Sequence, residues 1–167
     1  MSDAQEPTFL VSPHTDPVVV KIDGKANYLN CNAFREFIET IIRQGKRRIF
    51  IDCDDCKGMD STFLGILAGT AIDLKNQGQE DALIVGNLCD RNYELICNLG
   101  LQNLFTIERC GPEEPECFES LDDEKVSDAR EVLQAHENLA QADAENVAKF
   151  QDVIAFLRDQ VEDEASS

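Results

Sequence analysis

Two hydrophobic periods alternate along the first two thirds of the chain. Short apolar runs bounded by turn residues predict strands, and apolar residues spaced three and four apart predict helices. The strands are expected at 17–22, 48–52, 82–85 and 104–107, with a further short edge strand at 9–11 inside a loose tail, residues 1–15. The helices are expected at about 30–45, 62–77 and 90–99. Strands that alternate with helices of this length indicate an α/β domain with largely parallel pairing, at residues 16–111.

Turn and cap residues set the expected boundaries of these elements. Asp23 and Gly24 are a turn signal after the first strand of the domain, and residues 53–59 read as a loop. Asn30 is a suitable N-cap for the first helix, which Gly45 would end.

The last third of the chain has a different pattern. Residues 112–125 form an acidic linker, and residues 126–163 contain neither Gly nor Pro. A 3-4 spacing, mostly apolar, predicts an amphipathic helical extension through Val126, Ala129, Leu133, His136, Ala140, Asp143, Val147, Phe150, Ile154, Leu157 and Val161. Asp143 interrupts the stripe, so the extension is either one long helix or two helices that break near residues 141–143. The stripe either packs on the domain or forms a surface for a homodimer or another partner.

The net charge of the chain limits the classes of partner that it can bind. The formal net charge is −18, and residues 112–167 carry 17 acids against 4 bases. So acidic a chain repels nucleic acid and anionic lipid, whereas the charge is compatible with a basic protein partner without indicating one. The absence of a long apolar run or a signal-like start predicts a cytoplasmic protein. Seven cysteines, an odd number at core-like positions, favour reduced thiols over a disulfide framework.

The most obvious chemical motif is the pair Cys53 and Cys56, in a CxxC spacing. A zinc site needs about four ligands, and no second pair accompanies this one. A thioredoxin-type pair would open a helix, whereas Lys57 and Gly58 follow here. Structural thiols are therefore favoured, and a small redox enzyme is the lesser alternative.

The acids that follow the second strand of the domain invite comparison with receiver domains of two-component signalling. Asp52, Asp54, Asp55 and Asp60 lie there, but the acidic pair after the first strand and the late Lys of a receiver are missing. No phosphate-binding loop or nucleophile elbow is present. Ser61 has no histidine within the domain as a base. We therefore expect no catalytic residues, no cofactor and no metal, hence a protein that is not an enzyme.

What remains is the strand-to-helix junction at Asp60, Ser61 and Thr62. Asp, Ser and Thr are preferred helix caps, and the same position would hold a phosphate at the positive end of the helix dipole. The residues alone leave open whether Ser61 is an ordinary cap or a phosphoacceptor.

The stretch Asp60-Ser61-Thr62-Phe63-Leu64-Gly65 resembles the Asp-Ser-Ser-Gly-Leu-Gly signature of STAS domains, the sulphate transporter and anti-sigma factor antagonist family. The order of elements over residues 17–110 is similar as well, from the Gly24–Asn27 segment to Leu99-Gly100-Leu101. The resemblance implies a small STAS-like domain, in which helices pack on a mixed β-sheet, followed here by the acidic helical extension.

In the bacterial anti-sigma factor antagonists of this family, the Ser after the Asp is phosphorylated by a kinase that is itself an anti-sigma factor. The resemblance thus implies phosphorylation at Ser61, with Thr62 as a weaker acceptor, and a phosphatase that resets the switch. It implies a role in signal transduction and transcription regulation. The implied partner-binding residues are Asn27, Asp60, Ser61, Thr62 and Phe63.

Phe63 stands where the family usually has Gly, and is either a core residue or an exposed anchor for a partner. The alternative function is a scaffold that assembles through its C-terminal helix without phosphorylation.

Overall fold

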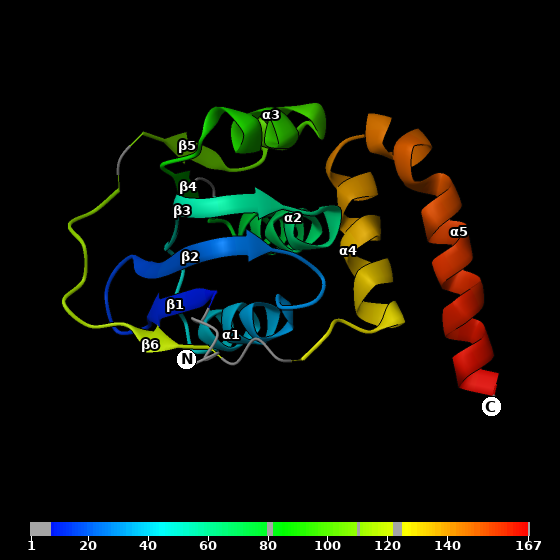
Figure 1. The fold of residues 1–167 in the computed structure, drawn as a ribbon, viewed down its shortest axis with the longest axis horizontal. Coiled ribbons are helices and arrows are strands. Elements are labelled where there is room, and N and C mark those ends of the chain that lie inside the picture. The colour runs from blue at the N-terminus through cyan, green and yellow to red at the C-terminus, as the bar shows by residue number, and fades with distance from the viewer. Residues whose placement is uncertain (1–7, 80–81, 110, 122–124, 167) are drawn as a thin grey trace, which may run out of the picture.

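The computed structural model describes residues 8–79, 82–109, 111–121 and 125–166. Six strands form one sheet in the order β5-β4-β3-β2-β1-β6 (Figure 1). Their bounds are β1 Phe9–Ser12, β2 Val18–Ala26, β3 Ile49–Met59, β4 Leu83–Gly86, β5 Thr106–Glu108 and β6 Glu119–Ser120. The helices are α1 Asn32–Arg43, α2 Ser61–Asn76, α3 Asp90–Asn98, the short 3-10 helix η1 Leu101–Asn103, α4 Ala129–Ala142 and α5 Glu145–Ser166.

The sheet is mixed, as the resemblance implied. The strands β2, β3, β4 and β5 pair in parallel, whereas β1 pairs antiparallel with β2 on one side and with β6 on the other. The expected edge strand at 9–11 is therefore an interior strand, which corrects the sequence interpretation. The partner that covers it, β6, lies in the predicted linker and was not expected. Residues 1–7 of the predicted tail and 122–124 of the predicted linker lie outside the described residues.

The two central strands are longer than expected. The turn predicted at Asp23 and Gly24 is wrong, because β2 continues to Ala26, and the loop predicted at 53–59 belongs to β3. Gly24 adopts a φ of 99°, and the register between β2 and β3 shifts on both sides of this segment. A glycine that admits an irregular step lets the two strands stay paired. Both strands consequently end together, beside the start of α2.

The start of α1 also differs from the prediction. The N-cap is Cys31, without a side-chain hydrogen bond, and Asn30 does not cap the helix. The Asn30 side-chain amide instead donates to the Lys25 carbonyl and its oxygen accepts from Asn27 N. Asn30 therefore shapes the turn between β2 and α1, as Asn commonly does.

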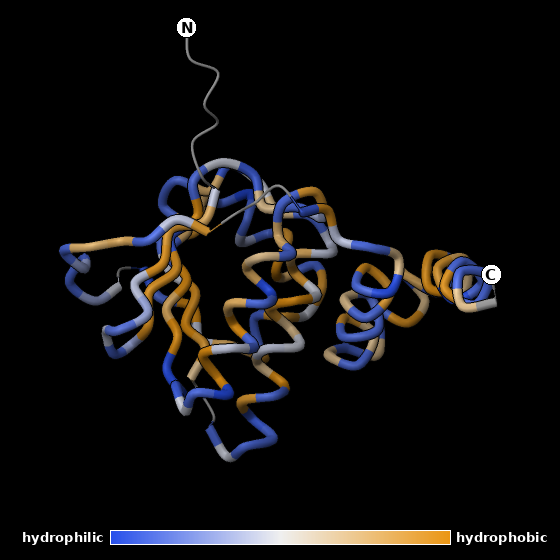
Figure 2. Tube along the Cα trace, turned by 90° about the horizontal axis from the view of Figure 1, so that it is seen from below, coloured by the Kyte–Doolittle hydropathy of each residue, from blue (hydrophilic) through white to orange (hydrophobic). Residues whose placement is uncertain are grey.

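One hydrophobic core joins the sheet to the helices. Three completely buried rings, Phe9 of β1, Phe34 of α1 and Phe63 of α2, pack on one another with centroid distances of 5.2 to 6.0 Å. Figure 2 shows the strands as nearly continuous hydrophobic segments, whereas the helices alternate between the two colours. This pattern is typical of strands covered by helices.

The C-terminal extension is two helices, which confirms the alternative with a break. Asp143 leaves helical geometry after α4, and its side chain accepts from the backbone N of Glu145. The two helices pack on each other through a small cluster of Leu133, Ile154 and Leu157. In Figure 1, α4 stands at the end of the sheet toward which β2 and β3 point, with α5 on its outer side. The extension thus packs against the domain at the predicted site.

Candidate functional site

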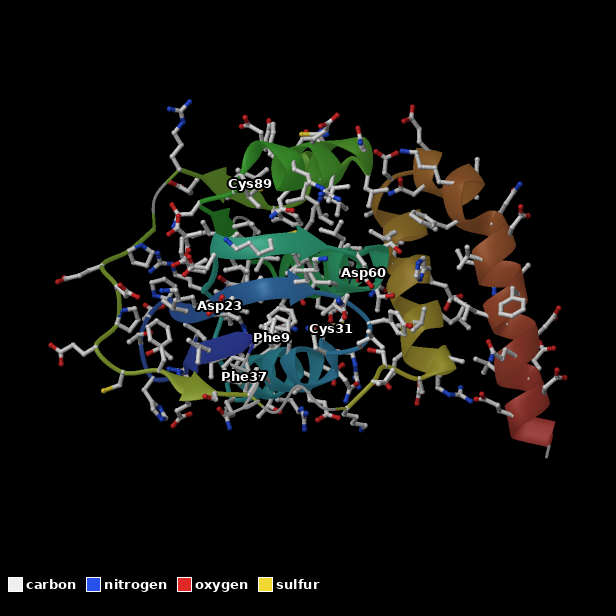
Figure 3. The ribbon with its side chains drawn as sticks, in the orientation of Figure 1. Phe9, Asp23, Cys31, Phe37, Asp60 and Cys89 are labelled. Carbon is white, nitrogen blue, oxygen red and sulfur yellow. The ribbon has the colours of Figure 1, made fainter. Side chains whose placement is uncertain are left out.

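The start of α2 is built by Asp60. One carboxylate oxygen accepts from Phe63 N at 2.8 Å and the other from Tyr28 N at 2.9 Å. The first bond caps α2, and the second fastens the β2–α1 turn to it. Asp60, not Ser61, is therefore the cap, and Ser61 is the first residue of the helix. Figure 3 shows Asp60 at the end of the central strands, facing α4.

The β2–α1 turn brings further residues to this place. The Asn27 side chain accepts from Leu29 N at 3.0 Å, and the Asn27 carbonyl accepts from the backbone N of Asn30. Tyr28 and Leu29 are 45% and 49% exposed, which is high for such side chains. The structure thus brings Asn27 close to Asp60 and adds two exposed apolar residues, which the sequence reasoning missed.

The hydroxyl of Ser61 has a partner from the extension. His136 Nε2 of α4 lies 2.9 Å from Ser61 Oγ, and His136 Nδ1 lies 2.7 Å from the Val132 carbonyl. Because a carbonyl only accepts, Nδ1 carries a proton, and in the neutral ring Nε2 accepts the Ser61 proton. No histidine lies within the domain, as the sequence indicated, but Ser61 nevertheless has a histidine partner. The partner comes from outside the domain, 75 residues along the chain.

A serine next to a histidine held at its other nitrogen resembles a nucleophile and its base. Substrate access is a second requirement, and His136 is only 5% exposed. The hollow of about 630 Å³ between α1, α2 and α4 is lined by residues such as Arg35, Thr70 and Asn138, not by Ser61 or His136. Because neither residue lines that hollow, we interpret the hydrogen bond between Ser61 and His136 as a contact that holds α2 and α4 together.

The other two residues of the predicted site point inward. Phe63 is completely buried in the stacked aromatic core, so its interpretation as an exposed anchor is wrong. Thr62 is 3% exposed. Among the hydroxyls at this junction, Ser61 is the more accessible, being partly exposed.

Small residues on α2 let α4 come very close. A Cβ added to Gly65 would meet the Ala135 carbonyl oxygen at 2.1 Å, and one added to Gly69 would meet the Asn138 side chain at 2.3 Å. Asn138 also donates to the Gly65 carbonyl at 3.1 Å. The stripe Ser61, Gly65 and Gly69, one turn apart on α2, is therefore the seat of α4.

The two cysteines of the CxxC pair are buried and free. Burial raises the pKa of the Cys53 thiol well above its ordinary value, and burial also raises that of Cys56. Thiols of this kind stay protonated and are poor nucleophiles and poor metal ligands. Within the described ranges, no group of three or more His, Cys, Asp and Glu side chains could hold a metal ion.

The acids after β3 are engaged in local contacts. Asp52 accepts from the Asn87 side chain and from Asp54 N, both at 3.0 Å, and Asp55 lies 3.8 Å from Lys21 Nζ. They therefore do not converge as receiver acids would.

The clearest missed residue is His136, a polar side chain in the apolar stripe of the extension. The sequence shows that His136 lies in this stripe, but it does not show that the side chain contacts the Ser61 hydroxyl. A second signal was the sequence of α2, which is apolar on nearly every side. A helix of that kind is covered on more than one face.

The STAS domain model matches residues 9–120. A candidate anti-sigma factor antagonist from Thermotoga maritima has a similar fold, with a TM-score of 0.53 and 17% identity over 61% of this chain and 86% of that one. The anti-sigma factor antagonist SpoIIAA, in its unphosphorylated form, gives a TM-score of 0.51 and 19% identity over 62% and 89% of the respective chains. Among curated proteins, none matches this sequence. Both structural similarities cover under two thirds of this chain.

Proposed function

Because this chain belongs to the STAS domain family, we propose that it is an anti-sigma factor antagonist, a non-catalytic switch that works through protein binding. In this proposal the unphosphorylated protein binds an anti-sigma factor that is also a serine kinase, and phosphorylation of Ser61 releases it. A phosphatase restores the binding form. The protein acts in the cytoplasm of a bacterium; within the described ranges, no helix combines the length and apolar character needed to cross a bilayer.

The observation that carries the proposal is the position of Ser61. It opens α2 directly after a cap that is already occupied, so its hydroxyl is not needed to hold the helix end. It is also the more exposed of the two hydroxyls that follow Asp60.

Phosphate at this position would act through charge. It adds about −1.5 to −2 at pH 7 beside the Asp60 carboxylate. A protein partner that docks on Asn27, Tyr28 and Asp60 would have to desolvate that charge. Binding is therefore lost without a change of fold, because the added charge lies on the surface that the partner contacts.

The test is phosphorylation of the whole protein by its cognate kinase with ATP, read by intact mass. We expect one phosphate on the wild type and none on Ser61→Ala. Thr62→Val should also carry one phosphate, because valine keeps the shape of the buried Thr62 side chain and removes only its hydroxyl. Phosphate that survives Ser61→Ala contradicts the site. Ser61→Asp should weaken kinase binding, and unchanged affinity contradicts the switch.

A scaffold that assembles through the extension is the second candidate, because α5 exposes Val147, Val153 and Phe156, the last by 67%. In the homodimer version of this proposal, light scattering would give twice the monomer mass for the wild type and the monomer mass for Phe156→Ser. A wild-type monomer at high concentration contradicts the homodimer.

A further inference from the structure

The extension meets the domain at the side chain that the proposed function uses. We infer that α4 is an intramolecular cover of Ser61: a kinase reaches the hydroxyl only when α4 has left α2, and a phosphate on Ser61 keeps α4 away. This inference rests on the proposed function, because the covered atom is the proposed phosphoacceptor.

The first argument is space. Ser61 Oγ and His136 Nε2 are 2.9 Å apart, which is one hydrogen bond and leaves no room for a phosphoryl group. One turn further along α2, Gly65 packs so tightly on Ala135 that even a methyl group would collide with the backbone of α4. The two helices are therefore in close contact along this turn, and a phosphoryl group on Ser61 requires α4 to move outward.

The second argument is charge. The two oxygens of the Asp60 carboxylate are engaged by Phe63 N and Tyr28 N, so the carboxylate stays beside Ser61. The facing side of α4 also carries Glu131, which pairs with Arg35 of α1. Arg35 offsets the charge of Glu131, so a phosphate on Ser61 would meet the Asp60 carboxylate as its nearest acid, with His136 as the facing base. Repulsion and lack of room act in the same direction, toward separation of the helices.

The third argument is that several of the contacts that hold α4 are polar and can be exchanged for water. These are His136 with Ser61, Asn138 with the Gly65 carbonyl, Glu131 with Arg35, and Ser127 N with the Tyr28 carbonyl at 2.8 Å. The apolar anchors include Ala135, Leu139 and Ala142, and Leu139 belongs to the core cluster of the domain. Hydrogen bonds of this kind contribute little net stability because water replaces them. The cover is therefore suited to opening without unfolding of the sheet.

The same contacts make the effect reciprocal. If phosphate on Ser61 disfavours the docking of α4, then a docked α4 disfavours the phosphorylated state of Ser61 by the same free energy. The rate at which a kinase phosphorylates Ser61 is a separate, kinetic readout of the fraction of open α4.

The experiment places phosphoserine at position 61 of the full chain by genetic code expansion, which needs no kinase. Amide hydrogen exchange of α4 is compared with that of the wild type, and exchange of β3 reports whether the domain stays folded. We expect α4 to exchange at least about tenfold faster with phosphoserine, and β3 to be unchanged.

Two glycine variants provide an opening without phosphate. Gly65→Ala meets the backbone of Ala135 and should release α4, whereas Gly69→Ala meets only the turnable Asn138 side chain and should stay closer to the wild type. His136→Ala, which removes one bond and adds no clash, should accelerate exchange least. If phosphoserine leaves α4 exchange unchanged or slows it, the inference is wrong; slowing would mean that His136 binds the phosphate.

Failure of the proposed function is separable. If the cognate kinase phosphorylates neither the wild type nor Gly65→Ala, the phosphorylation switch fails while the exchange result with phosphoserine still stands. If it phosphorylates both at the same rate, the cover is wrong and the switch stands. Faster phosphorylation of Gly65→Ala supports both.

Discussion

The α/β domain and the helical extension are held together by different kinds of contact. The domain has one continuous core, in which Phe9, Phe34 and Phe63 stack and the strands β2 to β4 are buried. The cluster that joins α4 to α5 has only three buried members, Leu133, Ile154 and Leu157. Polar bonds and a few apolar side chains, Leu139 above all, attach α4 to the domain, and Asn146 of α5 donates to the Leu99 carbonyl.

This difference indicates two levels of stability in one chain. A large apolar core unfolds as a unit, whereas segments with few buried contacts open locally at lower free energy. Elements that move in proteins are usually segments with few buried contacts. The extension has the properties of a part that moves, and the domain those of the part that it moves against.

The largest effect is expected in the domain core. Phe63→Ala removes a completely buried ring and should lower the free energy of unfolding by about 3–5 kcal/mol, because a cavity remains. Urea unfolding measures it. Phe156→Ala on α5 is the matched control, since its ring is 67% exposed and its loss should cost within about 0.5 kcal/mol. If the two variants lose the same free energy of unfolding, the domain and the extension do not differ in the way described.

A smaller and local effect is expected in the extension. Leu157→Ala should destabilise the α4–α5 contact by about 2–3 kcal/mol. Amide exchange should rise in α5 and in the outer face of α4, while β3 keeps its protection. Loss of protection throughout the sheet would show that the extension and the domain unfold as one unit.

Alkaline pH tests the boundary between the regions. Burial raises the pKa of the Cys31 thiol to about 12, and its sulfur lies 3.9 Å from Ser127 Oγ, just before α4. In the unfolded chain the thiol loses its proton near pH 8.5. The contribution of Cys31 to the free energy of unfolding is therefore fully present below that pH. It decreases as pH rises from about 9 to 12, by at most about 1.4 kcal/mol per pH unit.

Urea unfolding of the wild type and of Cys31→Ala across this pH range provides the measurement. The variant should be less stable at pH 7 but show a shallower decline. Parallel declines would contradict the assignment to Cys31.

The smallest effects are expected at the helix caps. Asp60→Ala and Asp128→Ala each remove an N-cap, of α2 and of α4, and should each cost about 1 kcal/mol. For Asp60 the loss should appear in global unfolding; for Asp128 it should appear in α4 exchange alone. If Asp128→Ala lowers the global unfolding midpoint as much as Asp60→Ala, the two-level description is wrong.

Local patterns predicted what depends on neighbours in the chain. The strand-to-helix junction at Asp60 and Ser61, the helices of the domain and the break at Asp143 all follow from periodicity and cap chemistry. The two-residue strand β6 has no such signal, because Glu119 and Ser120 are polar and pair with β1 only in the folded sheet.

Long-range contacts account for the remaining differences. The burial of Phe63 depends on rings from β1 and α1, and its partner-facing interpretation could not be rejected from a helix that is apolar on nearly all sides. The bond between Ser61 and His136 joins residues 75 positions apart. The sequence placed His136 in the apolar stripe of the extension, but only the packing of α4 on Gly65 explains why His136 meets Ser61.

The strand β6 has a consequence for any partner that competes with α4. Because β6 is paired to β1, the extension is tethered at Ser120, and about eight residues separate this point from the start of α4. A fully extended chain of that length reaches only about 26–29 Å. A released α4 therefore remains near its seat at an effective concentration of the order of millimolar. A kinase that binds Ser61 in trans must outcompete a helix that is always within reach, so brief openings favour an enzyme that is already bound nearby.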